Sequence, residues 1–267
     1  MTARIHPTAI VEDGARLGAD VVVGPFCHIG PHVEIGAGTQ LHAHVVITGR
    51  TSIGAGGIVF PFSVIGGPSQ DIKASLAEGD LTIGAGCVAR EHVTINSGVG
   101  AGTQIGANCV FLAGAHVAHD CRLGDDVVLS NQVLLGGHVE IDNAVMIGGG
   151  TAVHQFVRIG ACAFVGGLSG VEGDVIPFAL ASGNRAHLFG LNLVGLRRRG
   201  FNPEQIASLT AAYRQLFNTA GPGTLRERID QLIATGAESA DVAVMLKFLK
   251  APSQRPLCAP RSRGPDA

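Results

Sequence analysis

The hydrophobic positions of this chain repeat with a period of six. Every sixth residue over residues 5–65 is aliphatic, and a glycine follows many of these positions. The pattern breaks over 67–80, shifts by four residues across 97–102, and continues over 105–171. A hexapeptide period predicts a solenoid of short strands and tight turns, with glycine at the corners. Three such units close one triangular coil, so residues 18 apart in the sequence are expected to stack.

The pattern becomes helical after the repeat. Asn202-Pro203 marks a helix start, because Asn caps the first turn and Pro fits into it. The three expected helices cover residues 203–217, 224–235 and 238–250. The last residues are rich in Pro, Arg and Ser and have no period, so we expect them to be disordered. The expected units are a solenoid domain, a small α-helical domain and a tail, at residues 1–190, 191–250 and 251–267.

The composition agrees with a solenoid and excludes several classes of protein. Of 267 residues, 39 are Gly and only 4% are aromatic, which is too much Gly for a helical bundle. The net charge of −2 gives no indication of a nucleic-acid partner. No apolar run reaches the ~18 residues of a membrane span, and the N-terminus has no signal-peptide pattern. Six scattered cysteines without a C-x-x-C motif argue against a disulfide framework, so a cytoplasmic location is expected.

The charge is unevenly distributed. Residues 1–190 hold 8 Lys and Arg against 15 Asp and Glu, a net charge of −7. Residues 191–267 hold 11 against 6, a net charge of +5. A basic C-terminal part indicates an anionic ligand or an acidic protein partner.

The polar residues with chemical potential fall on one strip of the solenoid. Placed on an 18-residue coil, six of them occupy neighbouring positions over three coils: His116, His119, Asp120, His138, His154 and Gln155. In this frame, His138 stacks one coil after Asp120. His119-Asp120 is the strongest candidate pair, because His acts as a general base near neutral pH and a carboxylate orients it.

Two other interpretations of this strip remain open. The histidines could simply pack at the seam of a trimer. Three histidines could also hold zinc. The spacing His116-x2-His119, however, differs from the His-x4-His of β-helical carbonic anhydrases.

Two further segments are candidates for ligand binding. The break at 67–80 is an external loop, in which Gln70, Asp71 and Lys73 could bind a sugar or a phosphate. The run Arg197-Arg198-Arg199 suits phosphate recognition, because guanidinium groups donate paired hydrogen bonds. The alternatives are a solvated surface loop and a solvated basic collar.

Several motifs together resemble one enzyme family. They are Ile5-His6-Pro7-Thr8-Ala9-Ile10-Val11, Gln70-Asp71-Ile72-Lys73, Ala115-His116-Val117-Ala118-His119-Asp120-Cys121, Gly136-Gly137-His138, Thr151-Ala152-Val153-His154-Gln155-Phe156 and Gly195-Leu196-Arg197-Arg198-Arg199-Gly200-Phe201. The chain resembles, over about residues 3–250, the UDP-N-acetylglucosamine O-acyltransferases that begin lipid A biosynthesis. The resemblance implies a mainly β protein, a left-handed parallel β-helix with a small C-terminal α-helical domain. It also implies a homotrimer with active sites between subunits.

The same resemblance implies a reaction and its residues. A 3-hydroxyacyl chain passes from acyl carrier protein to the 3-hydroxyl of UDP-N-acetylglucosamine, with no metal and no other cofactor. His119 is implied as the general base, Asp120 as its support and the Gly137 N–H as the oxyanion donor. Gly167 matches a position that limits acyl-chain length. Substrate contacts are implied for Gln70, Asp71, Lys73, His116, His138, His154, Gln155, Asn192, Arg198 and Arg199.

The sequence also departs from the family pattern. Asn96-Ser97 stands where the family usually has His-Arg, and the loop that follows is shorter. Arg185 and Val194 replace a His and a Glu near the substrate. A 3-amino sugar acceptor therefore stays open beside the 3-hydroxyl, and a metalloenzyme or a non-catalytic scaffold are the remaining alternatives.

Overall fold

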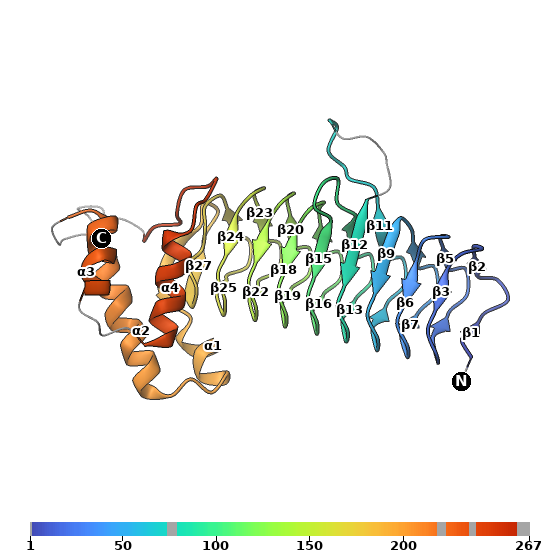
Figure 1. The fold of residues 1–267 in the computed structure, drawn as a ribbon, viewed down its shortest axis with the longest axis horizontal. Coiled ribbons are helices and arrows are strands. Elements are labelled where there is room, and N and C mark those ends of the chain that lie inside the picture. The colour runs from blue at the N-terminus through green and yellow to red at the C-terminus, as the bar shows by residue number, and fades with distance from the viewer. Residues whose placement is uncertain (1, 74–78, 218–222, 235–238, 261–267) are drawn as a thin grey trace.

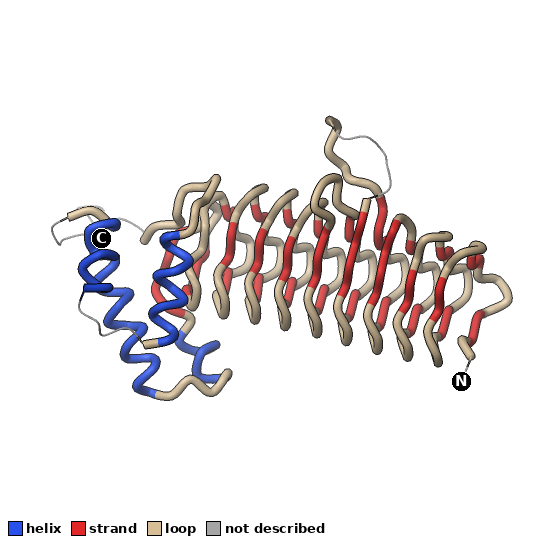
Figure 2. Tube along the Cα trace, viewed as in Figure 1, coloured by secondary structure: helices blue, strands red, loops and turns tan. Residues whose placement is uncertain are grey.

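The chain forms a three-sided parallel β-solenoid with helices at its C-terminal end (Figure 1). The computed structural model describes residues 2–73, 79–217, 223–234 and 239–260. Figure 2 shows the strands along the solenoid and the helices gathered beyond its last coils. The predicted fold class is confirmed.

Three sheets form the sides of the solenoid. Sheet A has the order β1 (Arg4–Ile5), β4 (Val22–Val23), β7 (Gln40–Leu41), β10 (Ile58–Val59), β13 (Val88–Ala89), β16 (Val110–Phe111), β19 (Val128–Leu129), β22 (Met146–Ile147), β25 (Phe164–Val165), β27 (Ala179–Ser182) and β28 (His187–Leu191). Sheet B has the order β2 (Ile10–Val11), β5 (His28–Ile29), β8 (Val46–Ile47), β11 (Val64–Gly67), β14 (Thr94–Asn96), β17 (His116–Val117), β20 (Leu134–Leu135), β23 (Ala152–Val153) and β26 (Gly170–Val171). Sheet C has the order β3 (Arg16–Leu17), β6 (Glu34–Ile35), β9 (Arg50–Ile53), β12 (Asp80–Ile83), β15 (Thr103–Ile105), β18 (Arg122–Leu123), β21 (Glu140–Ile141) and β24 (Arg158–Ile159).

The register confirms the 18-residue stacking and explains its interruptions. Val110 pairs with Val128, one coil of 18 residues later. Where the hexapeptide pattern breaks, Arg50 pairs with Asp80, and where it shifts, Thr94 pairs with His116. A strand that slipped would turn its aliphatic side chains away from the interior. The extra residues therefore leave the coil as loops, and the strands on either side stay in register.

The interior is a narrow column of aliphatic side chains. In sheet B, Ile29, Ile47 and Ile65 stack in successive coils and are at most 1% exposed. In sheet A, Phe111 is a buried ring in this interior, and the small side chain of Ala89 pairs with it in the preceding coil. Since each position stacks on its equivalent, a large ring needs a small neighbour, which accounts for the low aromatic content.

Three connecting edges join the sheets, and we name each by the sheets that it links. The A/B edge includes residues 112–115, 130–133, 148–151 and 166–169; the B/C edge includes 68–73, 97–102, 118–121, 136–139 and 154–157; the C/A edge includes 124–127, 142–145 and 160–163. Both insertions in the repeat fall on the B/C edge.

The C-terminal part begins with a hairpin and continues as four helices. β27 and β28 pair antiparallel. The helices are α1 (Leu193–Arg198), α2 (Pro203–Leu216), α3 (Leu225–Ala234) and α4 (Ala240–Lys250). The three predicted helices are confirmed, and Asn202 forms a complete capping box with Gln205. The short helix α1 was not predicted, and it contains Arg197 and Arg198 in its last turn.

The expectation of a disordered tail is wrong for residues 251–260. Leu257 pairs with Asp174 and Pro260 pairs with Leu188, while Cys258 is only 5% exposed. A segment rich in Pro, Arg and Ser has too few apolar side chains to form a core of its own. The last coils instead offer unpaired backbone groups that the segment satisfies. Residues 261–267 lie outside the described residues.

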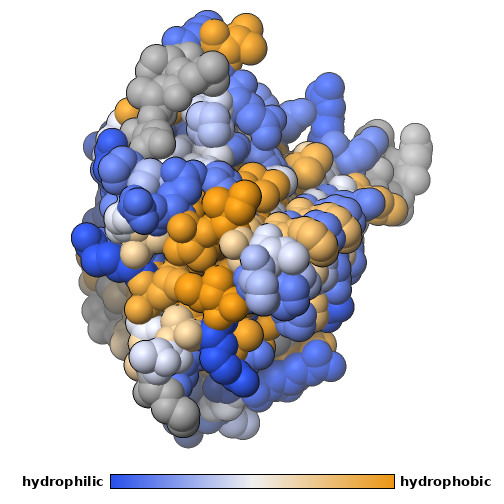
Figure 3. Space-filling view, turned by 90° about the vertical axis from the view of Figure 1, so that its right-hand side faces the viewer, coloured by the Kyte–Doolittle hydropathy of each residue, from blue (hydrophilic) through white to orange (hydrophobic). Residues whose placement is uncertain are grey.

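The N-terminal end of the solenoid presents apolar side chains (Figure 3). Ile5 and Ile10 in the first coil are 47% and 61% exposed, because no earlier coil stacks on them. Among the described residues, no helix has the length and apolar character that crossing a membrane requires.

Candidate active site on the B/C edge

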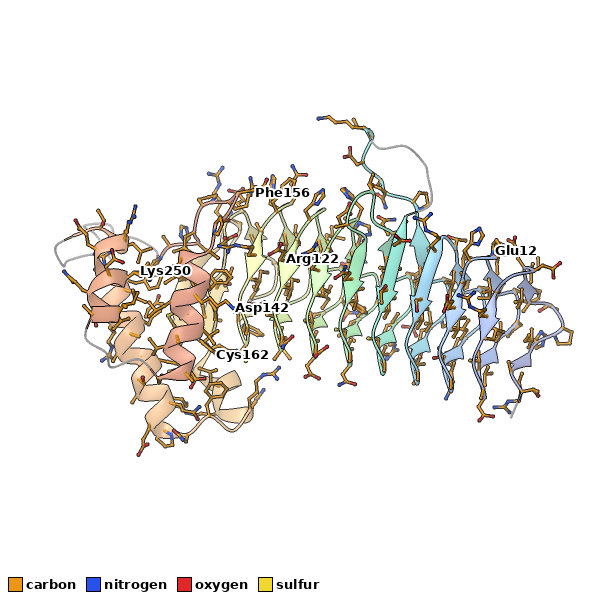
Figure 4. The ribbon with its side chains drawn as sticks, viewed as in Figure 1. Glu12, Arg122, Asp142, Phe156, Cys162 and Lys250 are labelled. Carbon is orange, nitrogen blue, oxygen red and sulfur yellow. The ribbon has the colours of Figure 1, made fainter. Side chains whose placement is uncertain are left out.

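The B/C edge brings together the strip of polar residues that the 18-residue frame predicted. His119 and Asp120 follow β17, Gly137 and His138 follow β20 one coil later, and Gln155 follows β23. Figure 4 labels Phe156 on this edge, the same edge from which the loop after β11 projects. The strands of sheet B hold these residues at successive heights along one line.

The corner conformation repeats from coil to coil. Asp120, His138 and Phe156 have φ angles of 57°, 58° and 66°, in the left-handed region that few residues other than glycine adopt. The rings of His138 and Phe156 stack with centroids 4.7 Å apart, and His119 meets His138 edge-on at 5.0 Å. The same conformation occurs at corners of the other edges, for example at Gln132 and Ala144, so it belongs to the tight turn of the solenoid.

His119 and Asp120 form a hydrogen-bonded pair. The distance from His119 Nδ1 to Asp120 Oδ2 is 2.9 Å, and Asp120 is 6% exposed. Burial alone raises the pKa of Asp120, but hydrogen bonds from His119 and from the N–H groups of Val99 and Gly100 lower it to about 2. The carboxylate is therefore ionised and can only accept. Nδ1 of His119 is then the donor of this hydrogen bond, and in a neutral imidazole with that tautomer Nε2 has a lone pair that can accept a proton.

Gly137 lies directly beside this lone pair. A Cβ atom at Gly137 would be 2.6 Å from His119 Nε2, closer than any side chain allows. Among the described residues, nothing accepts a hydrogen bond from the Gly137 N–H. Glycine thus lets the backbone approach the His119 imidazole, and an N–H in this position could donate to an oxyanion.

The remaining histidines of the strip have different surroundings. His116 lies on β17 with Nδ1 2.8 Å from Thr94 Oγ1, and burial lowers the pKa of its ring. His154 is exposed, and its Nδ1 lies 3.2 Å from the carbonyl of Gln155. His116 therefore lies on sheet B in the same coil as His119, and His154 lies on the B/C edge two coils later.

The loop after β11 places its three candidate residues on the same edge. Gln70, Asp71 and Lys73 are exposed. The Ser69 hydroxyl accepts from the Asp71 N–H at 3.0 Å, and Asp71 Oδ1 accepts from the Lys73 N–H at 2.9 Å. These bonds form a local turn that fixes the backbone of the loop.

The candidate arginines and Asn192 lie on a different edge. Asn192 caps α1 by accepting from the Gly195 N–H, and its Nδ2 donates to the Cys162 carbonyl at 3.1 Å. Arg199 Nη2 donates to the carbonyl of Ala144 at 3.0 Å, and Arg198 is its neighbour in α1. Cys162 and Ala144 belong to the C/A edge, which Figure 4 shows opposite Phe156. Within one chain these residues do not meet His119.

Gly167 lies on the third edge. It follows β25 on the A/B edge, where a Cβ atom would be 3.1 Å from the Gly149 carbonyl. The predicted site residues therefore occupy all three edges of one chain. The structure brings together only those on the B/C edge.

A groove runs from this edge onto sheet C. Its volume is about 450 Å³, and Asp120, His138 and Phe156 line it from the B/C edge. Sequence reasoning missed the groove's other walls, which are Ala101, Arg122, Glu140, Arg158 and residues 252–254. The volume is in the range of small-molecule sites. Nothing in a hexapeptide pattern shows that a tail will return to cover a sheet.

Sequence reasoning also missed the residues that hold Asp120. The N–H groups of Val99, Gly100 and Gly102 all donate to its carboxylate, at 3.0 to 3.2 Å. The only sequence signal was the four-residue shift of the repeat, with its closely spaced glycines.

The cluster has one arrangement that resembles a metal site. Single ligand atoms of His119, Asp120 and His138 lie within 4.8 Å of one another. Both carboxylate oxygens of Asp120, however, already accept hydrogen bonds from the backbone. A zinc ion would have to displace these donors, so the donor set fits a hydrogen-bonded base better than a metal centre.

Known proteins are similar to this chain over nearly its whole length. The acyl-[acyl-carrier-protein]–UDP-N-acetylglucosamine O-acyltransferase of Bartonella bacilliformis is 45% identical over 261 residues, covering 97% of this chain and 94% of the relative. The chain belongs to the family of UDP-N-acetylglucosamine O-acyltransferases. The family member of Rhizobium johnstonii is 47% identical over 262 residues, covering 97% of this chain and 96% of the relative.

Family models and solved structures agree with this membership. Residues 174–258 match the second domain of UDP-N-acetylglucosamine O-acyltransferases, and residues 14–49 and 102–137 match bacterial transferase hexapeptide repeats. The solved UDP-N-acetylglucosamine O-acyltransferase of Moraxella catarrhalis has a TM-score of 0.90 at 38% identity, covering 97% of this chain and 100% of that one. That of Francisella novicida has a TM-score of 0.91 at 29% identity, covering 97% and 95%.

Proposed function

We propose that this protein transfers a 3-hydroxyacyl chain from acyl carrier protein to the 3-hydroxyl of UDP-N-acetylglucosamine, the first step of lipid A biosynthesis. The observation that carries the proposal is the oriented His119–Asp120 pair beside Gly137. The printed names of the relatives supply the acyl donor and the sugar acceptor.

The reaction follows from the protonation state of the pair. Nε2 of His119 accepts the proton of the sugar 3-hydroxyl while that oxygen attacks the thioester carbonyl. Asp120 stabilises the imidazolium that forms, and the Gly137 N–H donates to the new oxyanion. The tetrahedral intermediate then collapses and breaks the carbon–sulfur bond. The imidazolium returns its proton to the leaving thiolate, so the products are an ester and a free pantetheine thiol.

We assign the proposed substrate contacts according to the edge on which each residue lies. Gln70, Asp71 and Lys73, with His116, His138, His154 and Gln155, contact the sugar and the acyl group. Asn192, Arg198 and Arg199 contact the UDP or pantetheine phosphates. Gly167 leaves room for a long acyl chain. The basic C-terminal part, with a net charge of +5, suits an acidic carrier protein.

The distribution over three edges supports a homotrimer with shared active sites. One chain cannot bring its own C/A edge and A/B edge to His119, because the prism separates them. Neighbouring copies around a threefold axis place different edges face to face. Each site then combines the base of one copy with the arginines of another.

The test is a transfer assay with UDP-N-acetylglucosamine and a panel of 3-hydroxyacyl carrier proteins, read by product mass. We expect an O-acylated sugar nucleotide, and His119→Ala should lower kcat by at least about a thousandfold without dissociating the oligomer. His92→Ala, on the A/B edge, is the control and should keep its activity. Near-normal turnover by His119→Ala would contradict the general-base role.

Two additions to the assay separate the alternatives. The 3-amino analogue of the acceptor reports whether Asn96 and Ser97 have changed the preferred sugar. We propose that no metal or other cofactor takes part, because the acyl group arrives already activated on phosphopantetheine. A chelator should then leave the rate unchanged, whereas a metalloenzyme would lose activity.

A further inference from the structure

A short segment beside the active site connects two parts of it. Residues 96–103, which we call the clamp, include the shift in the hexapeptide repeat and the departure Asn96-Ser97 from the family pattern. At its first end, Asn96 Nδ2 donates to the carbonyls of Pro68 and Gly67, at 2.9 and 3.4 Å. The backbone N–H and the hydroxyl of Ser97 also donate to the Gly67 carbonyl. These bonds tie the clamp to the start of the loop that carries Asp71 and Lys73.

The other end of the clamp surrounds the Asp120 carboxylate. Val99 N–H donates to Oδ2, and the N–H groups of Gly100 and Gly102 donate to Oδ1. The Thr103 hydroxyl accepts from the Asp120 N–H at 2.9 Å. With these donors in place, the carboxylate cannot rotate away from His119 without breaking several charge-assisted hydrogen bonds.

The backbone at the centre of the clamp, around Gly98, is too closely packed to accept a side chain. A Cβ atom at Gly98 would be 2.7 Å from Asp120 Oδ1 and 2.4 Å from the Cα of Gly102. Gly98 N–H also donates to the Asp80 carbonyl at 3.0 Å. The clamp therefore follows one path between β14 and β15.

The side chain of Asn96 has one unfavourable feature in this position. Its Oδ1 is buried and has no hydrogen-bond partner among the described residues. A buried acceptor without a hydrogen-bond partner destabilises the folded state. The amide cannot turn over to relieve this, because its oxygen would then face the carbonyls of Gly67 and Pro68. The two bonds from Nδ2 are thus the reason for this residue's orientation.

We propose that residues Asn96–Thr103 position the catalytic pair, by fixing the Asp120 carboxylate on His119 and tying it to the loop that carries Asp71 and Lys73. The proposal rests on the proposed function of this site. In this proposal the clamp is a positioning segment and takes no part in the proton transfer. It acts through Asp120 at one end and through the substrate loop at the other.

The first experiment separates positioning from general stability with a double-mutant cycle. Thr103→Val keeps the shape of the side chain and removes the acceptor of the Asp120 N–H. We expect kcat to fall about tenfold with little change in KM. In an Asp120→Ala background the same substitution should change kcat less than about twofold, because the carboxylate that the clamp orients is absent.

One control restores the hydroxyl at position 103, and the other removes a buried threonine hydroxyl on another edge. Thr103→Ser keeps the hydroxyl and should restore activity. Thr151→Val removes a buried hydroxyl that lies 3.4 Å from the Ser169 N–H on the A/B edge, and should leave kcat within about twofold. A loss of kcat that is equal with and without Asp120, or no loss at all, would overturn the positioning role.

The second experiment tests the tie to the substrate loop. Asn96→Ala removes the bonds to Gly67 and Pro68 and should raise KM for the UDP-sugar about five- to tenfold, more than it lowers kcat. Asn143→Ala removes an amide that accepts from the Asp125 N–H on the C/A edge, and should change neither constant. Equal effects of the two substitutions would contradict the tie.

The outcomes distinguish the two proposals. If His119→Ala keeps its activity, the proposed function fails and the clamp has no catalytic pair to position. If His119→Ala is inactive while Thr103→Val and Asn96→Ala behave like their controls, only the clamp fails.

Discussion

At the scale of residues, the proposed active site depends on a few side chains whose hydrogen bonding is determined by the backbone around them. Asp120 has a left-handed conformation at a prism corner, and its carboxylate lies within reach of three backbone N–H groups. The motif His119-Asp120 could be recognised in the sequence, as could the stacking of Gly137 near it. The low pKa of Asp120 could not, because its donors come from a loop about 20 residues earlier in the chain.

The pKa of Asp120 makes a prediction about stability and pH. Its folded value of about 2 lies below the ordinary value of 3.8, so the ionised carboxylate stabilises the fold above pH 4. This contribution of about 2 kcal/mol is lost as the pH falls from 4 toward 2. Asp120→Asn should therefore unfold more readily at pH 7, and the difference from wild type should narrow below pH 4. Thermal unfolding at one protein concentration measures this, and a difference independent of pH would contradict it.

Gly137 gives a second prediction at this scale. Gly137→Ala places a Cβ atom 2.6 Å from His119 Nε2, so the ring must move off the attacking hydroxyl. We expect kcat to fall about a hundredfold while thermal stability changes little. Gly149→Ala is the matched control, because the atom nearest to its Cβ would be the Asn131 carbonyl oxygen at 3.1 Å. Similar kinetic losses in both variants would show that the backbone, not the base, was disturbed.

At the scale of elements, the hexapeptide period and the capping signals predicted the strands and three helices, but not the docking of the tail. Asp174 joins the last coil, α4 and the tail. Its carboxylate accepts from the Arg158 backbone N–H and guanidinium, while its backbone pairs with Leu257. The Arg158 guanidinium in turn covers the ring of Phe248 in α4 at 4.5 Å. A period of six carries no information about such contacts between distant segments.

The Asp174–Arg158 pair predicts a large loss of stability when it is broken. Asp174 is 1% exposed, so Asp174→Ala leaves the Arg158 guanidinium without its buried partner. We expect a loss of about 3–5 kcal/mol in the free energy of unfolding, with the tail released from the solenoid. Thermal unfolding and limited proteolysis of the C-terminus measure the two effects. Glu172→Ala, an exposed neighbour, is the control, and a tail that stays protected in Asp174→Ala would contradict this account.

At the scale of the whole molecule, the solenoid separates its predicted site residues onto three edges. His119 lies on the B/C edge, Arg198 and Arg199 lie near the C/A edge, and Gly167 lies on the A/B edge. A rigid prism cannot fold one edge onto another. The shared trimeric site that we propose is the arrangement that reunites them.

Shared sites predict that two inactive variants complement each other. His119→Ala removes the base on one edge, and the double variant Arg198→Ala/Arg199→Ala removes the phosphate contacts on another. In trimers assembled at random from equal amounts, about a quarter of the sites combine an intact base with intact arginines. Transfer activity after co-expression should therefore reach about a quarter of the wild-type value. A mixture that stays inactive would place each complete site within one chain.

The sequence by itself determined the solenoid, its 18-residue stacking and the line of polar residues on one edge, because a strict repeat fixes which residues share a position. It also determined the start of α2, through the Asn202 cap. Only the tertiary structure decided which backbone groups surround Asp120, that residues 251–260 return to the solenoid with 252–254 lining the groove, and that the predicted ligand-binding residues lie on three edges. These features depend on contacts between loops and termini that no repeat relates, and such contacts exist only once the coils have stacked.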